Sequence, residues 1–208
     1  MTRRDTLSLI RADLHRYEGN SALRTFLRHI IINPGFRYTF WMRLCCYLGE
    51  RAVWRWTLFW PVRLALHRCE RRYGISISHR TDVGPGLHIG HFGGIVVSSR
   101  ARIGRNCNLS HGVTIGLAVR GRHAGYPTIG DDVYIGPGAK IIGCVKVGNR
   151  VAIGANAVVT RDIPDDAVAV GVPAAVISDK GSAGYICHTD YEANEPALPC
   201  SCAEGDSE

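Results

Sequence analysis

Residues 129–160 read IGDDVYIGPGAKIIGCVKVGNRVAIGANAVVT, and a large aliphatic residue recurs there at every sixth position. The same register extends over thirteen anchor positions, with one step of eight and one of fourteen: Ile77, Val83, Ile89, Val97, Ile103, Leu109, Ile115, Ile129, Ile135, Ile141, Val147, Ile153 and Val159. Gly directly follows eight of these anchors, and a small or aliphatic residue stands four positions after nine of them. So regular a period indicates stacked repeats.

A six-residue period fits a short strand that turns one aliphatic side chain inward and then reaches a corner, where Gly relieves steric strain. Three such strands close a triangular coil. Successive coils then stack at the parallel-strand spacing of about 4.8 Å, each pairing with the coils above and below. We therefore predict a mainly β fold, a parallel β-helix of about four coils over residues 75–177, with the anchors in a dry interior.

The chain before residue 75 has a helical pattern instead. Leu7, Ile10, Leu14 and Tyr17 recur at helical spacing, and Asn33-Pro34-Gly35 is expected to break the helix. Further helical runs are predicted at about 36–50 and 52–72. The predicted organisation is an α-helical N-terminal domain at 1–74, the β-helix at 75–177, and a mobile, acidic tail at 178–208.

Charge is unevenly distributed along the chain. Residues 1–75 hold fourteen Arg and five acidic residues, whereas residues 178–208 hold one Lys and seven acidic residues. A basic segment favours an anionic partner, but no nucleic-acid motif accompanies it. The aromatic, Arg-containing run 54–66 is expected to pack on the β-helix, with contact to a membrane surface as the less favoured alternative. The longest apolar runs are too short for a transmembrane helix.

The eight cysteines show no regular pairing, and no signal-peptide pattern follows Met1. We therefore expect free thiols in a reducing cytoplasm. Cys187, His188, Cys200 and Cys202 match no zinc-binding spacing, so no metal is expected. Cys107 and Cys144 are expected to point into the β-helix.

The two irregular steps predict loops at corners of the β-helix, where functional residues tend to lie. The first contains residues 89–94, IGHFGG, and the second is residues 117–128, LAVRGRHAGYPT. Counting the strands in threes places Ile89, Leu109, Ile135 and Ile153 on one face. The residues two positions later should then form one column: His91, His111, Pro137 and Ala155. Two imidazoles followed by small residues suit a base beside an extended ligand groove, although His111 and the loop residue His123 fit ordinary surface histidines equally well.

Several segments together resemble one known family. They are GLHIGHFGGIVV at 86–97, GYPTIG at 125–130, the run from 135 to GVPA at 171–174, and NPGFRYTFWMRL at 33–44. Over roughly residues 5–177 the chain resembles the serine acetyltransferases, hexapeptide-repeat acyltransferases whose close relatives include polysaccharide O-acetyltransferases. The resemblance implies a left-handed β-helix, a homotrimer, and acetyl transfer from acetyl-CoA to a small-molecule hydroxyl. The expected acceptor is L-serine, giving O-acetyl-L-serine for cysteine synthesis.

The resemblance also implies roles for particular residues. His91 matches the general base that takes the acceptor's proton as its oxygen attacks the thioester directly, and histidine titrates near working pH. His111 and His123 are further catalytic candidates. CoA would lie between the β-helices of two neighbouring subunits. The protein backbone would lie close to its pantetheine, and cationic side chains would contact its phosphates. The expected CoA-binding residues are Gly116, Arg120, Arg122, Pro137, Ala155 and Arg161.

Some positions depart from the family pattern. Gly90 stands where the family has Asp before the base, and Ser76 where it has an acid that orients the base. Tyr126 replaces a loop His, and the family's N-terminal Asp has no clear match near residues 18–20. These departures favour a sugar or polysaccharide hydroxyl as the alternative acceptor. A non-catalytic binding protein is a further alternative.

Overall fold

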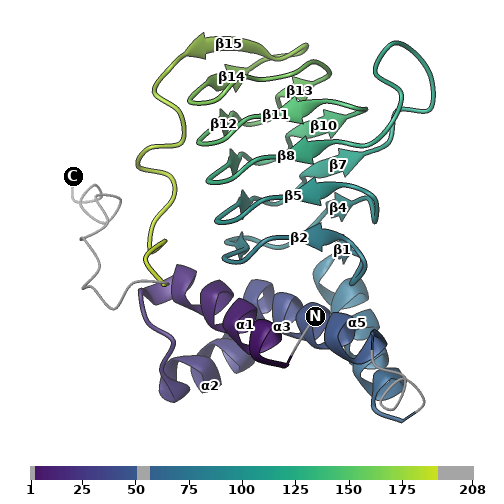
Figure 1. Cartoon of the computed structure of the whole chain (residues 1–208), viewed down its shortest axis with the longest axis vertical. Helices are drawn as coiled ribbons and strands as arrows, with labels where there is room; N and C mark the ends of the chain where they lie inside the picture. Colours follow the sequence, from purple (N-terminus) through teal and green to yellow (C-terminus); the bar gives the residue numbers. More distant parts are fainter. Residues whose placement is uncertain (1–2, 51–56, 192–208) are drawn as a thin grey trace.

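The computed structural model describes residues 3–50 and 57–191 and has two parts (Figure 1). A group of helices lies at one end, and a three-sided stack of short strands rises from it. The helices of the described residues are α1 (Arg3–Glu18), α2 (Leu23–Ile32), α3 (Pro34–Gly49) and α5 (Phe59–Tyr73). Gly74, in the left-handed conformation, caps α5 and leads directly into the first strand.

The strands form three sheets, one for each side of the stack. The first sheet contains β1 (Ile75–Ile77), β4 (Ile95–Val97), β7 (Thr114–Gly116), β10 (Lys140–Ile142) and β13 (Val158–Val159). The second contains β2 (Asp82–Val83), β5 (Arg102–Ile103), β8 (Thr128–Ile129) and β11 (Lys146–Val147). The third contains β3 (His88–Ile89), β6 (Asn108–Leu109), β9 (Tyr134–Ile135), β12 (Ala152–Ile153), β14 (Val168–Val170) and β15 (Ala175–Ser178). Pairing is parallel except between β14 and β15.

The predicted β-helix is confirmed, with its anchors inside. None of the thirteen anchors is more than 8% exposed, and the small residues four positions later are buried with them. Cys107 occupies one of these inward positions and is buried, as predicted. The prediction for Cys144 is wrong: it lies one position before the inward Val145, at a corner, and is exposed.

The helical part differs in detail from the predicted runs. Two helices precede Asn33, because Gly19 adopts a left-handed φ of 67° and ends α1. Asn33 closes α2 and also caps α3, since its side chain accepts a hydrogen bond from the Phe36 N–H at 3.1 Å. Pro34 fills the first position of α3, where a missing N–H costs nothing. The run expected from residue 52 is seen from Phe59, and residues 51–56 lie outside the described residues.

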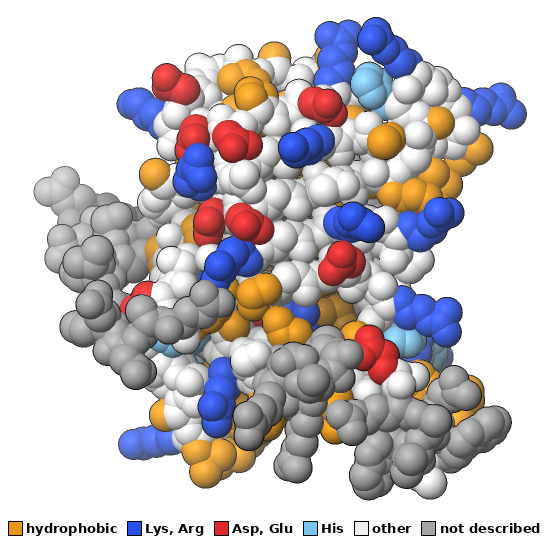
Figure 2. All heavy atoms as spheres, in the orientation of Figure 1, with side chains coloured by type: hydrophobic (Ala, Val, Ile, Leu, Met, Phe, Trp, Pro, Cys, Tyr) orange, Lys and Arg blue, Asp and Glu red, His pale blue; other side chains and the backbone are white. Residues whose placement is uncertain are grey.

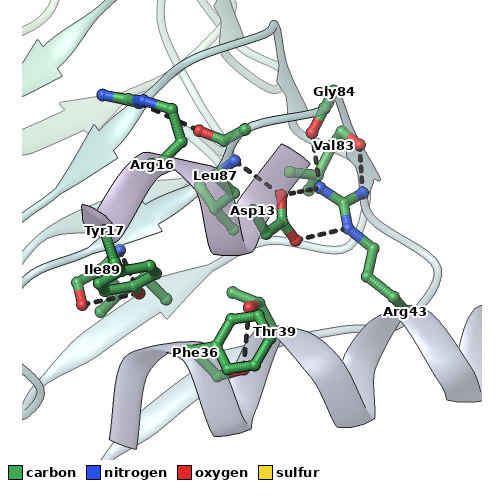
Figure 3. Close-up of polar contacts among 11 residues, drawn as sticks. Asp13, Arg16, Tyr17, Phe36, Thr39, Arg43, Val83, Gly84, Leu87 and Ile89 are labelled. Carbon is green, nitrogen blue, oxygen red and sulfur yellow. Dashed lines mark hydrogen bonds and ion pairs between the residues drawn. The ribbon is translucent and has the colours of Figure 1, made fainter. Parts of the chain in front are cut away.

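Side chains of the helices satisfy the exposed backbone edge of the first coil (Figure 3). The Tyr38 hydroxyl donates to the Ile77 carbonyl at 2.7 Å and accepts from its N–H at 2.8 Å. Arg43 donates to the carbonyls of Val83 and Gly84, both at 2.6 Å. Tyr17 exchanges bonds of 3.2 and 3.3 Å with Ile89. Each of the three sheets therefore begins against a polar side chain of the helices, which hydrogen-bonds backbone groups of its first strand.

Asp13 is buried and joins Arg43 to a further backbone group of the first coil. It forms a two-fold ion pair with Arg43, at 3.0 and 3.1 Å, and accepts from the Leu87 N–H at 2.9 Å. Gly35 lets α3 approach the coil, because a Cβ there would lie 2.1 Å from the Ile89 carbonyl oxygen.

The tail prediction is wrong for residues 178–191. This segment runs back along the third sheet toward the helices (Figure 1). Tyr185 stacks on Tyr134 with ring centroids 4.6 Å apart, and Arg16 donates to the Cys187 carbonyl at 2.7 Å. Stacking and buried hydrogen bonds order a segment whose composition alone suggested mobility. Residues 192–208, with Cys200 and Cys202, lie outside the described residues.

Two other features of the described residues bear on the sequence predictions. Cys187 is disulfide-bonded, contrary to the expected free thiol, whereas Cys45, Cys46, Cys69, Cys107 and Cys144 are free. Within residues 3–50 and 57–191, no helix combines the length and the apolar character needed to cross a bilayer.

Candidate functional site

His91 and His111 lie on the corner where the third sheet passes to the first. Their anchors, Ile89 and Leu109, are paired neighbours in the third sheet. Both side chains are exposed, and their ring centroids are 6.2 Å apart in an edge-to-face arrangement. The pairings of β6 with β9 and of β9 with β12 continue the column to Pro137 and Ala155. We call this column the histidine corner.

Left-handed residues turn the chain at this corner. Gly94, Gly112, Gly138 and Asn156 have φ values between 56° and 72° in successive coils. They stack closely, since a Cβ on Gly112 would lie 3.3 Å from the Gly138 Cα. The two extra residues of the irregular step are accommodated here, and Phe92 packs edge-on against Tyr73 of α5 at 5.6 Å. The step of eight therefore sets His91 on an enlarged corner beside the helices.

His88 lies between this corner and the helices. Its ring lies 4.5 Å from that of Tyr17 and within electrostatic reach of His91. Burial, followed by the positive charge of Arg16 and by His91, lowers the pKa of His88 to about 3. A neutral imidazole thus stands next to the predicted base.

Glu18 and His29 are polar groups near this corner that the sequence prediction missed. The Glu18 carboxylate contacts His29 Nε2 at 2.7 Å and also pairs with Arg28. His29 in turn packs on Tyr17, with ring centroids 5.2 Å apart. Their only sequence signal is an acid and a histidine on either side of the Gly19 turn, which by itself predicts no site.

The remaining predicted residues lie on the next corner, between the first and second sheets. Gly116 ends β7, and the loop that follows closes on itself through Ala118 and Gly125, which exchange bonds of 3.1 and 3.0 Å. The His123 carbonyl accepts from the Cys144 N–H at 2.7 Å, so the loop folds over the next coil. Arg120 and Arg122 are exposed on this loop, and Arg161 follows β13 on the same side. We call this the loop corner.

The predicted site residues therefore form two groups that flank the first sheet. The histidine corner holds His91, His111, Pro137 and Ala155, and the loop corner holds Gly116, Arg120, Arg122, His123 and Arg161. One chain does not bring His123 to His91. A cavity of about 750 Å³ between α1, α3, α5 and residues 79–83 contains residues of neither group.

Comparison with known proteins gives one consistent match. Residues 126–161 match the family model described as bacterial transferase hexapeptide (six repeats). The chain is 34% identical to a serine acetyltransferase of Synechococcus elongatus over 167 residues, covering 79% of this chain and 66% of that protein. It is 36% identical to the serine acetyltransferase of Helicobacter pylori strain J99, covering 72% of this chain and 84% of that one. It thus spans about two thirds of the first relative and most of the second.

Solved structures agree with this match. Serine acetyltransferase from Brucella abortus strain S19, in complex with coenzyme A, superimposes with a TM-score of 0.70 at 27% identity, covering 86% of this chain and 70% of that one. Serine acetyltransferase from Neisseria gonorrhoeae, in complex with serine, gives 0.68 at 28% identity, with 85% and 70% covered.

Proposed function

We propose that this chain, which belongs to the serine acetyltransferase family, transfers an acetyl group from acetyl-CoA to the hydroxyl of L-serine and so supplies O-acetyl-L-serine for cysteine synthesis. The observation that carries this proposal is the exposed imidazole of His91 on the histidine corner. The related structures with coenzyme A and with serine support the choice of donor and acceptor.

His91 acts as the general base. Its imidazole takes the proton of the acceptor hydroxyl while the oxygen attacks the thioester carbonyl, forming the new C–O bond. The C–S bond then breaks, and the imidazolium returns its proton to the departing CoA sulfur. A backbone N–H of the glycine-rich corner stabilises the oxyanion between these steps. His111, with its ring 6.2 Å away, stands beside the reacting groups as the second polar side chain of the corner.

CoA binding joins the two corners across a subunit boundary in a homotrimer. Within one chain, the loop corner and His91 lie on opposite edges of the first sheet. Each site therefore takes its loop from a neighbouring subunit. The pantetheine runs along Pro137 and Ala155 and meets Gly116 and His123 of the neighbour. Arg120, Arg122 and Arg161, which are exposed cations, meet the phosphates. Exposed Val96 on the sheet between the corners supports a contact between prisms.

A sugar hydroxyl is the second candidate acceptor. The residue before His91 is Gly90, which offers no carboxylate, and Ser76 on β1 is an exposed hydroxyl. Glu18, on the helical side of the corner, is already held by His29 and Arg28. A free amino acid presents an ammonium that needs an unpaired carboxylate, whereas a sugar does not.

A thiol-release assay with acetyl-CoA tests both acceptors. CoA release that requires L-serine supports the proposed function. Release that requires a sugar or polysaccharide, with none from L-serine, supports the second candidate. Folded protein that releases no CoA with either class of acceptor would be a binding protein, and the proposal would fail.

A further inference from the structure

Helix α2 carries an apolar stripe that no described part of the chain covers. Leu23, Leu27 and Ile31 follow one another at every fourth position and are 73%, 51% and 68% exposed. The opposite face of the helix is buried, with Thr25 and His29 in the protein interior. Burying three such side chains elsewhere would remove a large apolar area from water. The exposed stripe therefore indicates a binding surface.

Arginines border this stripe. Arg24 and Arg28 lie one position on from Leu23 and Leu27, so they form a parallel exposed row. Figure 2 shows hydrophobic and basic side chains together where Figure 1 places α2. Helix α5, at the same end of the molecule, repeats the combination: Trp60 and Leu64 are exposed, with Arg68 and Arg71 further along the same face.

The charge of the helical end of the molecule indicates which kind of partner it binds. The acidic side chains described in these helices are largely engaged: Asp13 pairs with Arg43, Glu18 with Arg28, and Glu70 with Arg63. A second copy of this end would bring arginines against arginines, without carboxylates to offset them. A bilayer of anionic lipids supplies both an apolar layer and negative headgroups.

We propose that the helical end of the molecule binds the surface of an anionic membrane through α2, with α5 as a second contact. Leu23, Leu27 and Ile31 insert at the level of the headgroups, and Trp60 lies at the interface. Arg24 of α2 and Arg68 and Arg71 of α5 meet lipid phosphates. The stack of strands then points away from the bilayer, with the histidine corner of its first coil next to the membrane. The proposal does not depend on acyl transfer.

Vesicle co-sedimentation tests this docking with the full chain. We expect binding to phosphatidylcholine vesicles that contain phosphatidylglycerol, weak binding to phosphatidylcholine alone, and weakening by salt. The double variant Leu27→Ser, Ile31→Ser should lower binding at least about tenfold, because less apolar area is buried. Arg24→Gln should lower it about fivefold, the usual effect of one cation at such a surface.

Ile177→Ser is the matched control. Ile177 is 64% exposed, close to Ile31, but lies on β15 at the opposite end of the molecule (Figure 1). Its variant should bind vesicles like wild type. Failure of wild type to bind the anionic vesicles, equal binding to both kinds of vesicle, or equal losses in the Ile177 and α2 variants would overturn the proposal. A smaller sedimentation mass of the lipid-free α2 variant would instead assign the stripe to a second copy, and would also overturn it.

Discussion

At the scale of single residues, the surroundings of His88 lower its pKa below that of a free histidine. It lies against Tyr17 beneath the corner that carries His91, and burial is the main cause of its lowered pKa. Below about pH 6.5 the unfolded chain binds a proton at this position, whereas the folded chain does not until about pH 3. The stability from this group is complete above pH 6.5 and is lost as the pH falls below it.

We therefore expect acid to weaken folding through His88. The free energy of unfolding should fall by about 1.4 kcal/mol per pH unit from this group, or roughly 2 kcal/mol between pH 6.5 and 5. Urea unfolding of wild type and of His88→Gln at both pH values measures it. The variant should lose less stability on acidification. Equal losses in the two proteins would show that His88 does not carry this effect.

At the residue scale, the six-residue register predicts some side-chain positions of the candidate site and not others. The column of His91, His111, Pro137 and Ala155 follows from counting strands in threes, because the step of six is rigid once the anchors point inward. The burial of His88 and the pairing of Glu18 with His29 could not be predicted in this way. They depend on where α1 and α2 pack against the first coil, and no repeat encodes that packing.

At the scale of elements, the helices act as a cap on the first coil. A strand edge presents unpaired N–H and carbonyl groups. Tyr38 and Tyr17 bond both kinds of group in the first and third sheets, and Arg43 bonds two carbonyls at the second. The helical pattern of the sequence predicted the helices, but not that Tyr38, Arg43 and Tyr17 would serve this purpose. Similarly, composition predicted a mobile tail, whereas residues 178–191 pair with the side of the stack.

The variant Tyr38→Phe tests the capping role of Tyr38, because it removes only the hydroxyl group. The variant keeps the ring in the core but leaves the Ile77 N–H and carbonyl without their partner, so it should destabilise folding by about 2 kcal/mol. Chemical unfolding measures this value. Tyr185→Phe is the control, because that exposed ring keeps its stacking on Tyr134 and should change stability by less than about 0.5 kcal/mol. Similar effects of the two variants would contradict a capping role for Tyr38.

At the scale of the whole molecule, the proposed site is distributed over two corners, so the proposed function needs residues of more than one chain. The sequence prediction placed CoA between two neighbouring β-helices. Within one chain, the fold places His91 and the loop residues on opposite edges of the first sheet. A chain of 22.8 kDa should therefore sediment as a trimer, with three times that mass. Val96→Glu, on the sheet between the corners, should shift the mass toward that of the single chain and lower turnover. A monomeric wild type with full activity would contradict the shared site.

The most direct test of the account is the turnover of His91→Ala, measured as CoA release at saturating acetyl-CoA and acceptor. His91 is exposed on a corner that the backbone stacking of Gly94, Gly112 and Gly138 supports, so the variant should keep the circular dichroism and sedimentation mass of wild type. Its turnover should be lower by about 10²-fold or more, the usual contribution of a general base. Turnover near that of wild type, from folded protein, would remove His91 from the reaction and contradict the mechanism.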